Sequence, residues 1–465
     1  MASKTYLTKP IDQDKMPSGI PYIVGNEAAE RFSFYGMKAI LAVFMTKFML
    51  DASGQPDLMS DAEATKWISL FAMANYFFPI LGAVLADGFL GKYRTILYLS
   101  LMYCLGHGTL ALMDVNLGVD QRTLLFWGLA MIAIGSGGIK PCVASHVGDQ
   151  FSRRNEHLLP IVFGWFYFAI NIGATVSMLL IPVIREKLGV GWAFGVPGIL
   201  MAIATFVFWL GRNKFVHVPP AGRELLKVTF SKPGRRAIFN LIPLYVFIAM
   251  FWALFDQTFS RWVMQAEDMD RNLWLFTPSA EQLLAANSIL VMILVPLTSY
   301  VIYPAINKVY TLTPLRKVGI GLFVTVPAFA ISGMIETWIQ AGQTPHIGWQ
   351  LLGYVVLTFA EILISITALE FSYTQAPNAM KSVIMGMFYL SVAFGNLFTA
   401  QVNHIIETAE KSGQVFLQGA NYYWFFTGCM LVTAVLYLFW APFYRGQTFI
   451  QSDEGNGEDA APATA

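Results

Sequence analysis

The sequence is short of charged residues and of cysteine. Charged residues make up 13% of its 465 positions, and 30 lysines and arginines almost balance 29 aspartates and glutamates. The resulting net charge of +1 offers no basic excess for nucleic acid, so we expect no nucleic-acid partner. The three cysteines stand alone, without a CxxC pair or a histidine at metal spacing. We therefore expect no bound metal.

Motifs of nucleotide binding and of hydrolysis are also missing. The glycines of GSGGIKP, at 135–141, lack the GxGxxG spacing and follow no predicted strand. Before Lys92, Ala86 replaces the first glycine of a Walker loop, and Tyr93 replaces its serine or threonine. The sequence has no HExxH, no GxSxG and no recognisable Ser/His/Asp set. We expect no enzyme and no cofactor, and we expect the driving energy to come from an ion gradient.

Long apolar segments dominate what is present, since 56% of the residues are hydrophobic. A helix needs roughly 20 apolar residues to cross a bilayer, and the runs are too long for barrel strands. About twelve candidate spans meet this length. They lie near 20–50, 65–86, 93–113, 123–145, 156–184, 191–211, 237–264, 282–307, 316–341, 348–374, 381–407 and 418–444. The sequence therefore predicts an all-α membrane protein of twelve transmembrane helices embedded in a lipid bilayer.

The distribution of basic residues predicts the orientation. Lysines and arginines concentrate in the segments at 92–94, 153–154, 212–236 and 308–317, and the opposite loops carry fewer. Basic loops stay in the cytoplasm, and the polar first residues lack the apolar core of a signal peptide. We expect both termini on the cytoplasmic side of the inner (plasma) membrane.

A polar segment divides the spans into two sets of six. The segment 212–236 contains a Pro-Pro pair and seven basic residues, which suits a cytosolic linker. We expect an N-terminal six-helix bundle at 1–211, a C-terminal one at 237–446 and a disordered acidic tail at 447–465. Two halves of six helices are the layout of the major facilitator fold, in which substrate binds between the halves.

Four ionisable residues lie inside the first span. Glu27, Glu30, Arg31 and Lys38 are spaced so that a helix places them along one stripe. A charge in hydrocarbon costs about 2.5 to 3.5 kcal/mol, and such residues usually line a polar path. We expect this stripe to face a cavity and not lipid.

Other spans carry single polar residues. Lys140, next to Pro141, lies deep in the fourth span and needs a partner to keep its charge, so we expect an acidic one. Asn171 in the fifth span is either a hydrogen-bonded link between helices or a substrate contact. Glu361 lies in the interior of the tenth span and is the better functional candidate there than Glu370, near the cytosolic end.

Five motifs in order resemble the proton-dependent oligopeptide transporter family. They are ExxERFSFYG at 27–36, GSGGIKP at 135–141, FYFAINIG at 166–173, FWALFDQ at 251–257 and EFSYTQAPNAMKS at 370–382. The last two are especially similar to animal peptide transporters. The loop after the ninth span has no room for their large extracellular domain, and the linker has none for an extra helix pair. A compact prokaryotic member fits best.

The resemblance implies a proton-coupled symporter that imports di- and tripeptides by alternating access, without an obligate protein partner. It implies cations for the peptide carboxylate at Arg31 and Lys140, and an acid for the peptide amine at Glu361. It implies polar contacts and a pocket aromatic at Tyr35, Tyr76, Asn171, Asn287 and Trp252. An alternative is a relative that carries nitrate, amino-acid conjugates or peptide-like drugs, although a simple anion has little use for Glu361.

The same resemblance implies how protons and gates act. Glu27, Glu30 and Asp256 would couple transport to protons. Lys38 with Asp256 would form the outer gate, and Lys140 with Glu361 would form the inner gate. The chain departs from the family pattern at four positions, which are Phe34 for Tyr, Lys38 for Arg, Ser69 for His and Phe388 for Trp. Lysine makes only a point contact with Asp256 where arginine would make a bidentate one, so we expect an easily broken outer gate.

Overall fold

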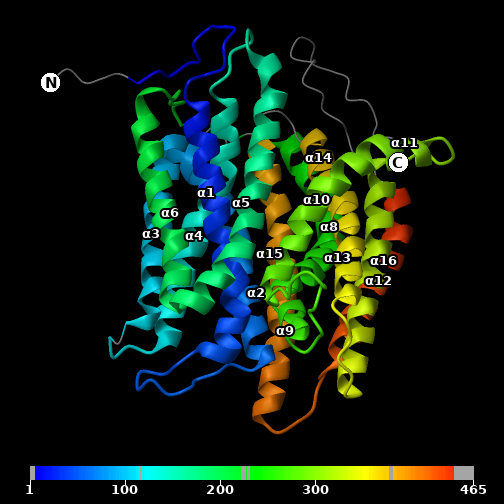
Figure 1. Ribbon diagram of the computed structural model, residues 1–465. Coiled ribbons are helices and arrows are strands. Elements are labelled where there is room, and N and C mark those ends of the chain that lie inside the picture. Colours follow the sequence, from blue (N-terminus) through cyan, green and yellow to red (C-terminus); the bar gives the residue numbers. More distant parts are fainter. Residues whose placement is uncertain are drawn as a thin grey trace. The chain divides into compact units, whose positions relative to one another are not determined.

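The computed structural model describes residues 6–115, 117–220, 222, 227, 231–375 and 381–444. The predicted acidic tail and part of the predicted linker lie outside these residues. The described chain is almost entirely helical (Figure 1), and its strand pairing is limited to isolated bridges such as Leu7 with Val216. This confirms the predicted all-α class.

Eleven described helical segments are long and apolar enough to cross a membrane. The predicted first span is a further helix, α1 (Ile20–Val43), which continues as a π-helical turn at Phe44–Phe48. It is 24 residues long, but its four ionisable residues set it apart from the other eleven. Each predicted span is thus matched by a helical segment, and the protein is a multi-pass membrane protein.

The chain divides into two compact units. Unit 1 comprises Met1–Leu58 and Ala74–Leu225, and unit 2 comprises Met59–Met73 and Leu226–Ala465. The first part of α2 (Asp61–Leu85) therefore belongs to unit 2, although its second part belongs to unit 1. The predicted bundle boundaries at 211 and 237 stay predictions.

Unit 1 is built from long helices that lie side by side (Figure 1). Helix α1 packs against α5 and α6, and α3 packs against α4 and α6. The bounds are α3 (Lys92–Ala111), α4 (Gln121–Gly148), α5 (Leu159–Leu188) and α6 (Val190–Leu210). The four charged residues of the stripe on α1, which are Glu27, Glu30, Arg31 and Lys38, are all buried.

Unit 2 contains more broken helices. Its seventh span consists of α8 (Lys232–Phe255), a 3-10 turn (Asp256–Phe259) and α9 (Arg261–Glu267). Its eighth and tenth spans contain π-helical turns at Thr298–Ile302 and Ile362–Ile366. The remaining elements are α10 (Ala285–Leu297), α11 (Tyr303–Asn307), α12 (Pro314–Gln340), α13 (Gly348–Glu361), α14 (Thr367–Thr374), α15 (Lys381–Lys411) and α16 (Ala420–Trp440). Irregular backbone is tolerated at membrane depth only where protein or a polar cavity surrounds it.

Glycines bring two pairs of helices into close contact. A Cβ on Gly82 of α2 would lie 2.2 Å from the carbonyl oxygen of Gly138 on α4. In unit 2, a Cβ on Gly395 of α15 would lie 2.2 Å from the carbonyl oxygen of Ala249 on α8. Helices in lipid associate by such close packing, because no hydrophobic force drives them together there. The glycines of the GSGGIKP motif therefore have a packing role.

Candidate substrate and coupling sites

Two carboxylates share one guanidinium in the middle of α1. The Nε of Arg31 lies 2.8 Å from Oε1 of Glu27 and 2.7 Å from Oε2 of Glu30. These three residues are at most 8% exposed. The offsets of three and four residues along the helix bring them together, as the sequence spacing predicts. A buried cation held by two acids can change partners when either acid takes up a proton.

Ser136 of α4 completes this cluster. Its Oγ donates a hydrogen bond of 2.6 Å to Oε1 of Glu30, and both residues are fully buried. Ser136 lies in the GSGGIKP motif, but the sequence predicts no role for it. The sequence feature that could have identified Ser136 is its position one helical turn before Lys140. Polar residues on one face of a spanning helix tend to face the same polar space.

Lys140 lies between two aromatic rings. Its Nζ is 4.4 Å from the ring centroid of Phe34 and 4.4 Å from that of Tyr76. Within the described part of unit 1, this ammonium has no hydrogen-bond partner and no carboxylate at ion-pair distance. The negative face of each ring attracts this cation. Glu361, the acid of the predicted inner gate, belongs to unit 2, so the acidic partner of Lys140 stays a prediction. The departure at Phe34 thus removes a hydroxyl and keeps the ring face.

The sequence also predicted functional roles for Lys38 and Tyr35 on α1 and for Asn171 on α5. Lys38 is buried farther along α1, and its predicted partner Asp256 belongs to unit 2, so the outer gate stays a prediction. Tyr35 is half-buried, and its ring packs edge-on against Phe34 at 5.4 Å. Asn171 donates a 2.9 Å hydrogen bond to the carbonyl of Tyr167 in its own helix. This recorded bond does not join two helices.

Glu361 of unit 2 is held by an amide. The Nδ2 of Asn287 on α10 donates hydrogen bonds of 2.8 Å to Oε2 of Glu361 and 3.0 Å to Oγ1 of Thr358. Glu361 is the last residue of α13, directly before the π-helical turn. Single π-helical turns are frequent at functional sites. The structure therefore brings together two of the predicted peptide contacts, Asn287 and Glu361.

Asp256 lies where the seventh span breaks. It is the first residue of the 3-10 turn between α8 and α9, and it is buried. Its Oδ2 accepts a 2.6 Å hydrogen bond from Nδ2 of Asn396 on α15. Asn396 is a second residue that sequence reasoning missed, and its only signal was an amide inside a predicted span.

Trp252 lies on α8, one helical turn before Asp256. Its Nε1 is buried and has no hydrogen-bond partner among the described residues. Its ring packs near those of Phe251, Phe255 and Phe388, at centroid distances of 5.1, 5.4 and 6.5 Å. A buried donor without a partner is costly unless a ligand or water satisfies it. The departure at Phe388 shapes the wall beside this tryptophan.

Unit 2 contains a further ionic cluster, which the sequence did not predict. Glu407 of α15 pairs with Lys66 on the first part of α2 and, at 2.6 Å, with Lys411. Nearby, Nη2 of Arg261 donates a 2.8 Å hydrogen bond to Asn403, and Arg261 lies 3.8 Å from Asp61. These contacts fasten the beginning of α2 to α9 and α15. No motif identified them, because they join residues far apart in the sequence.

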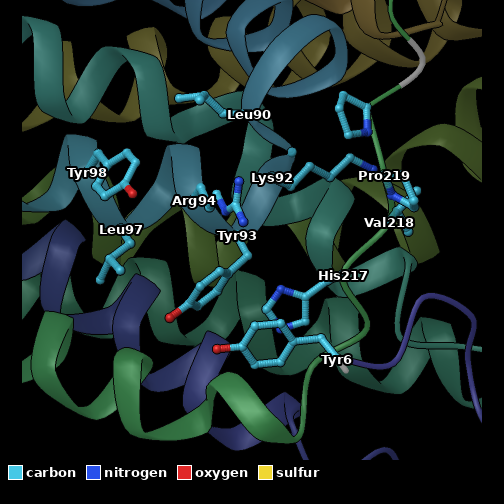
Figure 2. Close-up of a pocket in the computed structure, with 12 residues that line it drawn as sticks. Tyr6, Leu90, Lys92, Tyr93, Arg94, Leu97, Tyr98, His217, Val218 and Pro219 are labelled. Atoms are coloured by element: carbon cyan, nitrogen blue, oxygen red, sulfur yellow. The ribbon is translucent and has the colours of Figure 1, made fainter. Parts of the chain in front are cut away.

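A separate cavity of about 330 Å³ lies at the turn between α2 and α3 in unit 1 (Figure 2). Figure 2 shows the rings of Tyr6, Tyr93 and His217 gathered there, and His217 lies 4.2 Å from Tyr6 and 4.6 Å from Tyr93 by ring centroids. Lys92 also lines it and makes an ion pair of 2.7 Å with Asp149. The residues that line the cavity hold the α2–α3 turn in place, and none of them is a predicted peptide-binding residue.

The sequence matches the POT family at residues 93–232 and 228–425. The chain therefore belongs to the POT family, a family of membrane transporters with the major facilitator fold.

Curated relatives include animal carriers. Solute carrier family 15 member 2 of Rattus norvegicus is 34% identical over 397 residues, which cover 76% of this chain and 53% of the relative. Peptide transporter family 1 of Drosophila melanogaster is 35% identical over 361 residues, covering 69% of this chain and 48% of the relative. The chain spans about half the length of these curated relatives.

Solved structures match over nearly the whole chain. The POT family transporter PepTSo has a TM-score of 0.81 and 35% identity, covering 92% of this chain and 99% of that one. An auto-inhibited POT family peptide transporter has a TM-score of 0.82 and 34% identity, covering 95% and 99%. The similarity thus extends over both units of the present chain.

Proposed function

We propose that this protein is a proton-coupled symporter that imports di- and tripeptides by alternating access. The observation that carries the proposal is the sharing of Arg31 between Glu27 and Glu30, 2.8 and 2.7 Å from its Nε. A peptide carboxylate bound to this guanidinium would add a third negative charge beside Glu27 and Glu30, and these like charges repel one another. Protonation of Glu27 or Glu30 removes one of the negative charges and favours peptide binding, which links peptide binding to proton binding.

A peptide has a negative carboxylate at one end and a positive amino group at the other. The residues predicted to bind these ends carry the opposite charges. Arg31 and Lys140 would bind the carboxylate, because the ammonium of Lys140 meets two rings at 4.4 Å and no carboxylate among the described residues of its unit. Glu361, held by Asn287, would bind the amino terminus. A simple anion would leave Glu361 without a cation, so a peptide suits these residues better than nitrate does.

The space between the two ends must accept many side chains. Trp252, with its unpaired Nε1, supplies an aromatic wall and a donor for a peptide carbonyl. Tyr35, Tyr76, Asn171 and Asn287 are the polar contacts proposed for the peptide backbone. Such pockets combine apolar walls with a few placed polar groups. Asp256 would act as a further proton site, with Lys38 as the cation that its protonation releases.

The proposed location is the inner (plasma) membrane, with both termini in the cytoplasm. The positive-inside distribution of lysine and arginine supports this orientation. The energy source is the proton gradient, and no cofactor or protein partner is proposed. An inside-negative potential adds about 2.3 kcal/mol per charge per 100 mV to inward proton flow. Uptake of neutral peptides is then electrogenic.

The test is uptake of labelled dialanine into proteoliposomes, with and without an inward proton gradient. We expect gradient-driven uptake that excess tripeptide suppresses. Lys140→Ala removes a charge-assisted contact worth about 1.5 to 3 kcal/mol, so we expect the KM for peptide to rise about 10- to 100-fold. Glu361→Gln tests the amine contact. Absence of uptake by folded, inserted wild-type protein would reject the peptide assignment.

Coupling is tested separately from binding. The Glu30→Gln variant keeps the shape of the side chain and loses its proton site. We expect this variant to exchange labelled for unlabelled peptide across the membrane and to lose accumulation against a gradient. Ser145→Ala on α4 is the control, since among the described residues its hydroxyl bonds to carbonyls of its own helix, those of Pro141 and Cys142. Normal accumulation by Glu30→Gln would remove Glu30 from the coupling mechanism.

A further inference from the structure

A groove of about 580 Å³ lies on unit 2 between α12 and α16. Its lining includes Gly319 and Tyr437, which are buried, and Leu438, which is 55% exposed. A Cβ on Gly319 would lie 3.1 Å from Cε1 of Tyr437, so the glycine leaves the two helices in close contact at the base of the groove. Phe323 and Val324 add apolar surface on the α12 side.

Both helices that form the groove cross the membrane. Water is not a suitable occupant of a mainly apolar groove. On α12 the groove extends from Leu315 to Pro327, which corresponds to about 18 Å of helix. One leaflet of a bilayer has about 15 Å of hydrocarbon, half of the roughly 30 Å core. The groove is therefore long enough to hold one acyl chain of a single leaflet.

A cation lies at one end of the groove. Arg316 is exposed, and its side chain lies in the first turn of α12. Its Nη1 donates a 2.8 Å hydrogen bond to the carbonyl of Thr311, and its Cζ lies 4.7 Å from the ring centroid of Tyr310. In the part of the chain that the structure describes, no carboxylate pairs with Arg316. A guanidinium has five N–H donors, so donors remain for a phosphate.

The same end of unit 2 carries further positive charge. Lys308 precedes α12, and Lys317 follows Arg316, with its Nζ 4.1 Å from the ring centroid of Tyr303. Concentrations of basic residues mark the cytoplasmic side of a membrane protein. That leaflet is the one whose anionic lipids attract lysine and arginine near the surface.

We propose that this groove is a binding site for an anionic glycerophospholipid. One acyl chain lies between α12 and α16, and the phosphate contacts Arg316. The charge at the rim favours an anionic headgroup over phosphatidylcholine, whose choline cation cancels the phosphate charge. This site is independent of peptide transport, since none of the proposed peptide contacts lines it.

The test measures lipid retention by the full-length, delipidated protein. The protein is titrated in detergent with phosphatidylglycerol or with phosphatidylcholine, and bound lipids are counted by native mass spectrometry. Arg316→Ala removes the phosphate contact, and Val324→Trp fills the apolar groove. Arg235→Ala is the matched control, because it removes an exposed cation at the start of α8, outside the groove.

We expect the wild type to retain one phosphatidylglycerol more tightly than phosphatidylcholine. Arg316→Ala should weaken this retention about fivefold, the effect of roughly one cation near an anionic lipid. Val324→Trp should abolish retention of either lipid at this site, and Arg235→Ala should leave it unchanged. Equal retention of the two lipids, or equal effects of Arg316→Ala and Arg235→Ala, would overturn the proposal.

Discussion

Ser136 donates a hydrogen bond of 2.6 Å to Glu30, and the pair lies wholly inside unit 1. The bond joins α4 to α1 at the point where Glu30 also contacts Arg31. A buried carboxylate needs such donors to keep its charge. The serine therefore belongs to the charge cluster as much as the residues of the ExxER motif do.

Replacement of this serine should destabilise the protein. Ser136→Ala removes a hydrogen bond to a charged group, and we expect the free energy of unfolding to fall by about 1.5 to 3 kcal/mol. Thermal unfolding of the purified protein measures this loss. In the background of Glu30→Gln the acceptor is uncharged, so the cost of Ser136→Ala should be smaller there. Equal costs in both backgrounds would mean that the serine does not act through the charge of Glu30.

The contact between α2 and α4 predicts a position where even one methyl group is not tolerated. Gly82→Ala would place a Cβ 2.2 Å from the backbone oxygen of Gly138, which cannot move away as a side chain could. We expect a loss of about 1 to 3 kcal/mol or more in stability. Gly25→Ala on α1 is the control, because its Cβ would meet no atom within 4 Å. Equal melting temperatures of the two variants would contradict the close contact.

The ion pair of Glu407 predicts unequal roles for its two lysines. The side chain of Lys66 is 16% exposed, and that of Lys411 is 70% exposed. Exposed ion pairs contribute about 0 to 1 kcal/mol, so Lys411→Ala should change stability little. Lys66→Met leaves Glu407 without its buried partner and should cost about 1 to 3 kcal/mol. Thermal unfolding compares them, and an equal loss in both variants would reject this assignment.

His217 predicts a dependence of stability on pH. Burial lowers the pKa of His217, and Arg94 adds to this effect, although the hydrogen bond of 2.8 Å to the carbonyl of Arg212 opposes it. The folded protein therefore binds fewer protons at this site than the unfolded chain does. The stabilising contribution is complete above the unfolded pKa of about 6.5 and declines as the pH falls below it.

The measurement is the melting temperature between pH 7.5 and pH 5. His217→Phe keeps an aromatic ring against Tyr6 and Tyr93. We expect its melting temperature to fall less between pH 7.5 and pH 5 than that of the wild type. His346 supplies the control, since it is exposed and belongs to unit 2, so His346→Phe should retain the wild-type decline. An unchanged profile in His217→Phe would assign the pH dependence to other groups.

Hydropathy and charge, which are local properties of the sequence, determined the helical membrane class and the existence of each span. The stripe of Glu27, Glu30, Arg31 and Lys38 was also readable, because the period of a helix converts sequence spacing into a shared face. Burial of all four residues agrees with that reading. The five family motifs identified the family, since their order and specificity do not depend on coordinates.

Tertiary structure alone decided which partners these residues have. Within unit 1, Lys140 meets the rings of Phe34 and Tyr76, and Ser136 on α4 donates its hydrogen bond to Glu30 on α1. Such contacts depend on how helices pack at distances set by glycines such as Gly82, and no spacing rule within one helix predicts them. The sequence by itself therefore determined the helical spans and the shared face of the charges on α1, because both follow from local patterns, and only the packing of helices decided what each charge meets.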